Sequence, residues 1–556
     1  MIRGPVCSQL TMRRGLGKER ASVSTNMAHG GVGVLAADSQ WSQCISTLAE
    51  FTQLFKSDAY RNNAAMSVFN DVFAALSVVR TAMTTVTNKT AAATSVVNST
   101  AATTMGTDQT AATTTGCDRE HPLDDYLVKC ATETFRCLRN ACAGCRGNQS
   151  TIGGSTTVMS DTCAVLEVVF DQPSTAELIM LQRCAMQFIG NMCVGHNHNQ
   201  ENVCRQFLCT FRRLLQSSDC GVVNYTCMVL HNCLLTQTAD TTNRVLPDYL
   251  CLDDDTVASV VLSVIEQTVQ ADVEWGLFVV EDLLQVAAFC ETIYTKLPPT
   301  QRLFVVEVAI GMLKRAESDT STEKLHVVAV ENLLYLGREV KAYSHQILQA
   351  GLQDTGDSQT PLLLVKILET LGMATSQYSL YGSLQDDSDL FVCCINLLHG
   401  IHDIGRQGGN HFTAVEKMTE SDRIDPHHPA FGLKRDLIRL LANMVFRHRV
   451  NQDKVRELDG IPLILDQSNM DGKNPFITQW VVLAVRNLCE GNSDNKQYLA
   501  GLRLEGLANN VTVLQEFGVK AELHGDKIVV RPPDEDSPGD RGEGGATGGQ
   551  DCGQTS

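Results

Sequence analysis

The sequence predicts an all-α fold built as a solenoid, and three observations lead to that prediction. At 556 residues the chain is well beyond the size at which one core stops growing, so it forms several domains or an extended repeat structure. Only 6% of the residues are aromatic, and Leu, Val and Ala dominate the apolar 43%, as expected for helix-on-helix packing. Finally, one short motif recurs along the chain at a spacing that is typical of helical repeats.

The recurring motif is an apolar residue, an Arg or small residue and an Asn, with a second Asn eight positions later. Its clear copies are LRNACAGCRGNQ, IGNMCVGHNHNQ, LANMVFRHRVNQ and VRNLCEGNSDNK, which begin at Leu138, Ile189, Leu441 and Val485. The first Asn recurs after 51 residues between positions 140 and 191, and after 44 between 443 and 487. Because HEAT and armadillo repeats are roughly 40 to 47 residues long, the sequence predicts an armadillo- or HEAT-like α-solenoid.

Weaker copies of the motif extend the pattern. VLHNCLL contains Asn232, which lies 41 residues after Asn191, and two further candidates contain Asn332 and Asn396. From these intervals we expect about eight to ten helical repeats. We call the first Asn of each better copy a ladder residue, and the ladder consists of Asn140, Asn191, Asn232, Asn443 and Asn487.

The ladder residues have two interpretations. Asn487 stands inside the apolar run WVVLAVRNLCEG, although Asn is a poor residue for a helix interior and an unpaired buried amide costs free energy. The ladder could line a groove and bind the backbone of an extended partner peptide, or each Asn could tie one repeat to its neighbour through a backbone hydrogen bond. The sequence leaves both open. The second Asn of each motif, such as Asn451, is expected to be the N-cap of the following helix.

The chain outside these motifs divides by composition. Residues 81–116 contain 14 Thr and 8 Ala among 36 residues, which indicates a disordered insertion. The alternating stretch around His524 predicts a small hairpin. The expected order is a basic, Ser/Thr-containing disordered extension (1–38), the first solenoid helices (39–80), the Thr/Ala-rich insertion (81–119), armadillo-like repeats (120–430), C-terminal repeats (431–515), the hairpin (516–531) and a disordered Gly-rich acidic tail (532–556).

The charge and cysteine content restrict the partners and the compartment. A formal charge of -18 argues against nucleic acid as the main ligand and favours protein partners, including basic segments. No apolar run approaches the roughly 20 residues that span a bilayer, and no signal-peptide core follows the start. The 21 cysteines are therefore expected to be reduced thiols in a cytoplasmic protein.

Two clusters resemble metal sites, but a structural explanation is simpler for each. Cys142 and Cys145 form a CxxC, yet the repeat position of Cys142 holds Val445 in another copy, and a position that accepts Val is a packing position. The stretch HGIHDIG at residues 399–405 superficially resembles a metal phosphohydrolase site, but a solvated loop at a helix end explains it. We expect no metal, no cofactor and no enzymatic activity.

A family resemblance adds to these expectations. The segment from Asp436 to Leu502 resembles the C-terminal signature domain of the ataxin-10 family, and FRCLRNACAGCRGNQSTI and CAMQFIGNMCVGHNHNQENV resemble that family's N-terminal repeats. The resemblance implies an armadillo-like cytoplasmic scaffold without catalytic activity, linked in the family to cytokinesis and to neurite growth. The Thr/Ala-rich insertion and the basic start depart from the family pattern. A regulator of a G protein, as an exchange factor or chaperone with an armadillo fold, is the alternative function.

Overall fold

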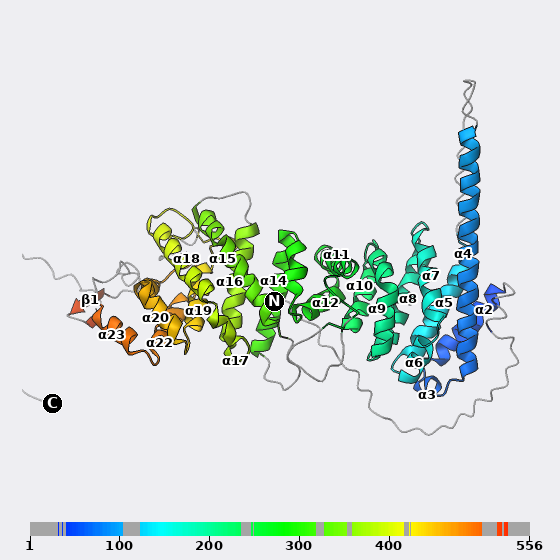
Figure 1. Cartoon of the computed structure of the whole chain (residues 1–556), viewed down its shortest axis with the longest axis horizontal. Coiled ribbons are helices and arrows are strands. Elements are labelled where there is room, and N and C mark those ends of the chain that lie inside the picture. The colour runs from blue at the N-terminus through cyan, green and yellow to red at the C-terminus, as the bar shows by residue number, and fades with distance from the viewer. Residues whose placement is uncertain are drawn as a thin grey trace, which may run out of the picture.

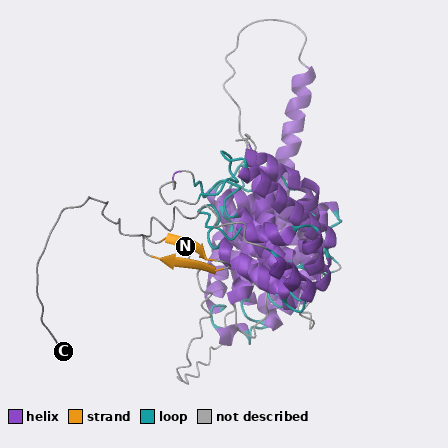
Figure 2. Cartoon of the chain, turned by 90° about the vertical axis from the view of Figure 1, so that its left-hand side faces the viewer, coloured by secondary structure: helices purple, strands orange, loops and turns teal. Residues whose placement is uncertain are grey.

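The computed structural model describes residues 32, 36, 40–103, 123–234, 246–247, 249–318, 327–352, 359–415, 422, 424–502, 520–524 and 527–531. Over these residues the chain is an elongated stack of helices, with the N-terminal helices at one end and the C-terminal helices at the other (Figure 1). Viewed along the stack, the helices superimpose on one another (Figure 2). The expected all-α solenoid is confirmed.

The helices form two parallel rows. In the first, which we call the ladder row, each helix packs on the next. Its members are α2 (Trp41–Leu54), α5 (Asp125–Cys142), α8 (Ala176–Cys193), α10 (Cys220–Leu234), α12 (Glu274–Leu284), α14 (Pro299–Ser318), α16 (Gln359–Ser376), α19 (Leu433–Met444) and α22 (Ile477–Cys489). These are nine helices within the described ranges, and five of them carry the ladder residues.

The second row, the companion row, covers one side of the ladder row. It contains α4 (Met66–Thr103), α7 (Val158–Phe170), α9 (Asn197–Leu214), α11 (Asp255–Ala271), α15 (Val330–Leu352), α18 (Ser388–Arg406) and α21 (Gly460–Asp466). Short helices connect the rows: α3 (Asp58–Arg61), α6 (Arg146–Gly153), α13 (Phe289–Thr292), η1 (Tyr294–Lys296), α17 (Tyr378–Tyr381), η2 (Gly382–Asp386), α20 (Arg449–Glu457) and α23 (Ser493–Gly501).

The core between the rows is continuous and aliphatic. Leu138, Ile189 and Leu441, which open three of the motif copies, are each at most 1% exposed. Cys142 and Cys193 are fully buried, and Val445 at the equivalent position is 1% exposed. This position therefore belongs to the packed core, where a thiol acts as a small apolar group.

Helix α4 corrects the predicted insertion. It continues to Thr103 and projects beyond the rest of the stack, so the segment that was expected to be disordered from residue 81 is helical as far as residue 103 (Figure 1). Residues 104–119 lie outside the described residues. The reason is local: Ala has the highest helix propensity. In addition, the hydroxyls of Thr81, Thr84 and Thr85 donate to carbonyls four residues earlier, which satisfies them within the helix.

The same helix is the one candidate membrane span among the described residues. Met66–Asn88 is long and apolar enough to cross a bilayer, and a third of that window is buried. Val72, Leu76 and Val79 are fully buried in the core, and Arg80 pairs with Asp161 of α7 at 2.9 Å. A core helix of a solenoid passes the same length and hydropathy test, and these contacts explain its apolar face.

The two ends of the chain are described only in part. Val32 and Ala36 are helical and buried, so the extension that was predicted to be disordered over residues 1–38 contributes to the core at these two positions. At the other end, β1 (Lys520–His524) and β2 (Lys527–Arg531) pair antiparallel, with Lys520 opposite Arg531, where the sequence predicts a hairpin. The tail predicted over 532–556 lies outside the described residues.

Candidate protein-binding face

The five ladder residues all donate a side-chain hydrogen bond to the preceding ladder-row helix. Asn140 Nδ2 bonds the carbonyl oxygen of Thr52 at 3.0 Å, and Asn487 Nδ2 bonds that of Ala442 at 2.9 Å. The other three bonds join Asn191 to Arg139 at 3.0 Å, Asn232 to Gly190 at 3.3 Å and Asn443 to Gly372 at 3.0 Å. Each bond pairs a carbonyl of one repeat with an amide of the next.

This geometry explains why a buried Asn is tolerated in an apolar helix. Asn487 is only 3% exposed, and its amide group satisfies a carbonyl that a larger apolar residue would leave bare. The structure therefore supplies the inter-repeat bond for every ladder residue. Contact of the ladder with a partner peptide stays a prediction, and such contact would have to share side chains that already hold at least one inter-repeat hydrogen bond each.

The sequence predicted that the second Asn of each motif is the N-cap of the following helix, and this prediction is wrong. Asn451 is the third residue of α20, and the cap is His448, whose Nδ1 accepts from the Asn451 amide at 3.3 Å. The Nδ2 of Asn451 bonds the carbonyls of Met444 and Gln385, both at 2.9 Å. Asn148, Asn199 and Asn495 make equivalent pairs of bonds. The second Asn is thus a buried clamp that joins two repeats.

Two of the weaker motif copies, those with Asn332 and Asn396, do not contribute to the ladder. Asn332 lies in the first turn of α15 and is fully buried, where it bonds the carbonyls of Leu284 and Val286. Asn396 is exposed on α18. Both lie beside an apolar pattern that many amphipathic helices share.

The turn between the ladder-row helix and the next helix has one left-handed residue four positions after the ladder Asn. Three copies place glycine there, with φ between 64° and 68°, whereas Arg447 has φ 53° in the fourth. A side chain in this region is strained, and glycine is not.

We expect Gly491→Ala to lower the free energy of unfolding by about 1 kcal/mol, because no atom lies within 4 Å of the added Cβ and only backbone strain changes. The reverse substitution, Arg447→Gly, should raise it by up to about 1 kcal/mol. Urea unfolding of both variants checks the pair. Equal and unchanged midpoints would contradict the assignment of strain to this position.

A stripe of arginines lies beside the ladder residues. At the positions one, four and eight residues before Asn140, Asn191, Asn443 and Asn487, six of the twelve residues are Arg and none is acidic. These offsets fall within one narrow arc of a helix, so the side chains share a face. We call this set the arginine stripe, and it consists of Arg136, Arg139, Arg183, Arg435, Arg439 and Arg486. The aligned motifs contain this signal, but only the position next to the Asn was recognised from the sequence.

Half of the stripe is neutralised by carboxylates. Arg183 forms a bidentate pair with Asp219, Arg435 a bidentate pair with Asp436, and Arg136 pairs with Glu133 at 3.2 Å. Among the described residues, Arg139, Arg439 and Arg486 form no ion pair. These three guanidinium groups leave positive charge on the ladder row of an acidic chain.

Arg439 is the most unusual member of the stripe. Its guanidinium lies over the ring of Trp480 at 4.9 Å and donates to Ser376 Oγ at 3.3 Å, while its Nε atom is buried without a hydrogen-bond partner. Burial lowers the pKa of Arg439 from its usual value. An arginine held on an aromatic ring is a good binding point for an anionic group, which would contact the terminal guanidinium nitrogens because Nε is buried.

An aromatic cluster lies on the same row at α10 and α12. The rings of His231, Trp275 and Phe278 are 5.4 to 5.8 Å apart, and His231 Nδ1 bonds the buried Asp282 carboxylate at 2.6 Å. Phe278 is 37% exposed. Exposed aromatic and arginine side chains are the types enriched at the centres of protein interfaces.

The residues that resembled metal sites contact other parts of the fold. Cys145 Sγ faces the carbonyl of Arg61 at 3.8 Å, and His402 contacts Gln467. His399 and His402 lie within helix α18, not in the loop that the sequence suggested, because the helix runs on to Arg406. No group of three or more potential metal ligands occurs in the part of the chain that the structure describes.

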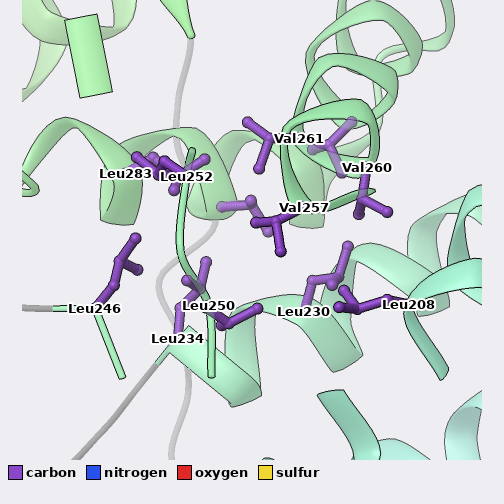
Figure 3. A pocket seen from close by; sticks show the side chains of 12 residues that line it. Leu208, Leu230, Leu234, Leu246, Leu250, Leu252, Val257, Val260, Val261 and Leu283 are labelled. Carbon is purple, nitrogen blue, oxygen red and sulfur yellow. The ribbon is translucent and has the colours of Figure 1, made fainter. Parts of the chain in front are cut away.

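The cavities are poor ligand sites. One of about 30 Å³ lies among α9 to α12 and is lined by twelve Leu and Val side chains, with no polar group to orient a ligand (Figure 3). A wider cleft of about 400 Å³ lies beside α15, but two of its charged pairs, Arg338 with Glu291 and Lys341 with Asp387, already neutralise each other. The ladder row is the better candidate surface.

A buried carboxylate in the core supports a pH prediction. Glu339 accepts from Tyr294 Oη at 3.0 Å and Arg302 at 3.2 Å, and burial raises its pKa above 4.5 despite these bonds. The folded state therefore holds the proton more tightly than the unfolded state, so this stabilising contribution is complete below pH 4.5 and is lost as pH rises through the folded pKa.

Relative to a Glu339→Gln variant, the wild type should lose unfolding free energy as pH rises from 4.5 towards neutrality. The two proteins share all other titrating groups, so their difference in urea unfolding isolates this one. Parallel curves over that range would contradict the raised pKa.

Comparison with known proteins agrees with the C-terminal resemblance. A family model described as the spinocerebellar ataxia type 10 protein domain matches residues 433–531, from α19 to β2. Ataxin-10 of Xenopus tropicalis is 30% identical over 409 residues, which cover 72% of this chain and 80% of that protein. The ataxin-10 homolog of Dictyostelium discoideum is 47% identical over 89 residues, or 16% of this chain and 14% of its own.

Among solved structures, one titled for the interaction between cadherin and beta-catenin covers 83% of this chain and 88% of its own. The identity is 13% and the TM-score is 0.26. The sequence relatives, by contrast, extend over most of the chain at 30% identity.

Proposed function

The chain belongs to the ataxin-10 family, and from this premise we propose that it is a noncatalytic, cytoplasmic scaffold that binds protein partners along its ladder row. The observation that supports this most directly is the arginine stripe next to the ladder, with the exposed Phe278 and the partly buried Trp275 and Trp480 on the same row of helices. A long row of this kind offers an extended partner many contacts, as helical-repeat proteins commonly do. The family's link to cytokinesis leads us to propose partners that act in cell division.

The test is affinity purification from native cell extract with two matched double variants. Phe278→Ser with Arg486→Gln changes the ladder row, whereas Val269→Ser with Arg205→Gln changes the companion row at residues of similar exposure. Circular dichroism must first show equal helicity. We expect the ladder-row variant to lose partners that the wild type and the companion-row variant retain. If both variants keep the same partners, the binding surface lies elsewhere.

A further inference from the structure

We infer that the ladder row binds an acidic, extended segment of its partner, through the arginines that have no carboxylate of their own. This inference rests on the proposed scaffold function and names the chemistry of its partner. It also differs from what the net charge of -18 suggests, which is a basic partner.

The charge near the binding surface decides whether the partner segment is acidic or basic, because salt screens distant charges. At physiological ionic strength exposed charges act over about 8 Å. Six of the chain's acids lie between residues 534 and 556, against one Arg, and therefore say little about the ladder row. On that row the unpaired charges of the stripe are Arg139, Arg439 and Arg486, and the stripe positions hold no acid.

The chemistry of these arginines suits carboxylates. Arg139 already donates to the neutral oxygens of Gln187 at 2.6 Å and Asn140 at 3.1 Å, so its charge is not compensated by these contacts. Arg439 is held over the ring of Trp480 and forms no ion pair among the described residues, although the carboxylates of Glu317, Asp436 and Glu369 act on its charge. A guanidinium pre-positioned in this way loses little entropy on binding and can form paired hydrogen bonds with a carboxylate.

The geometry also favours an extended segment over a compact one. Arg439 and Arg486 lie on adjacent helices, α19 and α22, whereas Arg139 lies on α5, near the other end of the row (Figure 1). One compact domain would contact only some of these three arginines. A chain that runs along the row can place acids opposite several repeats in turn.

The experiment uses the full chain and two fluorescein-labelled peptides, octaglutamate and octalysine, measured by fluorescence anisotropy at two salt concentrations. The stripe variant is Arg139→Gln/Arg439→Gln/Arg486→Gln. The control is Arg205→Gln/Arg338→Gln/Arg449→Gln, which removes the same number of charges from arginines that are paired elsewhere. We expect octaglutamate to bind the stripe variant at least tenfold more weakly than the control, with weaker binding at higher salt.

Three further variants control for loss of folding, for charge alone and for binding of the chain's own tail. Arg486→Gln alone changes an exposed side chain and should weaken binding without altering the thermal melt. Arg439→Lys should also weaken binding, because a lysine keeps the charge but cannot form paired hydrogen bonds with a carboxylate. Equal octaglutamate affinity of the stripe variant and the control, or binding of octalysine alone, would overturn the inference. Binding that appears only after the six tail acids are neutralised would assign the stripe to the chain's own tail and so overturn a partner site. If affinity purification captures ladder-row partners but octaglutamate does not bind, the scaffold function is supported and only the inference of an acidic segment is wrong.

Discussion

Asp471→Asn is expected to lower the free energy of unfolding by about 3–5 kcal/mol, because it leaves a buried lysine without its counter-charge. Lys434 Nζ lies 3.5 Å from Asp471 Oδ2, and the two side chains are 9% and 6% exposed. Burial lowers the pKa of Lys434 although Asp471 acts in the opposite direction, because burial disfavours the charged form. Urea unfolding followed by circular dichroism measures the change.

A double variant separates charge from packing at this site. Lys434→Met combined with Asp471→Asn removes both charges and should recover most of the lost stability, since a buried pair is often replaceable by apolar groups. If the double variant is as unstable as Asp471→Asn alone, the stability comes from the hydrogen bond that Asn474 Nδ2 donates to Asp471 Oδ2 at 2.8 Å, which the amide nitrogen of an Asn cannot accept, and the ion pair does not carry it.

Asn451→Ala is the second large effect, with an expected loss of about 2–4 kcal/mol. The substitution removes the Nδ2 donor that bonds the carbonyls of Gln385 and Met444. Asn451 is only 1% exposed, so water cannot replace this donor. Each buried group left without a partner costs roughly 1–3 kcal/mol. Because repeats interact mainly with their neighbours, the C-terminal repeats should unfold at lower urea than the rest.

Asn396→Ala is the matched control for this prediction. It removes the same side chain from an exposed position on α18 and should change stability by less than about 0.5 kcal/mol. A loss of similar size in both variants would mean that the effect of Asn451→Ala does not come from the inter-repeat clamp.

The two kinds of recurring position in the motif, Asn and Arg, thus have different roles. The paired Asn residues hold the repeats together through backbone carbonyls, and Gln452 adds a further bond to the carbonyl of Asn487 at 2.9 Å. The arginine stripe contributes less to the stability of the solenoid, since three of its members make no ion pair among the described residues. Stability tests should therefore respond to the Asn positions, and binding tests to the Arg positions.

Sequence alone determined the class and the repeat of this protein. The interval between motif copies and the Leu, Val and Ala content are properties of the chain itself, and they predict stacked helices because each repeat must bury an apolar face on its neighbour. The exchange of Cys142 for Val445 likewise identified a packing position. The residues from Asp436 to Leu502 were enough to indicate the family, which the relatives confirm.

Only the tertiary structure decided what each Asn does and where charge remains. The ladder amides find their carbonyls between 42 and 88 residues away, and the second Asn, expected to cap its own helix, bonds across repeats instead. Likewise, Arg183 and Arg439 occupy the same stripe, but only Arg183 meets a carboxylate, from Asp219, 36 residues along the chain. The physical reason is that hydrogen bonds and ion pairs form only between groups of adjacent repeats that lie within about 3 Å of each other. The local sequence does not specify which groups these are.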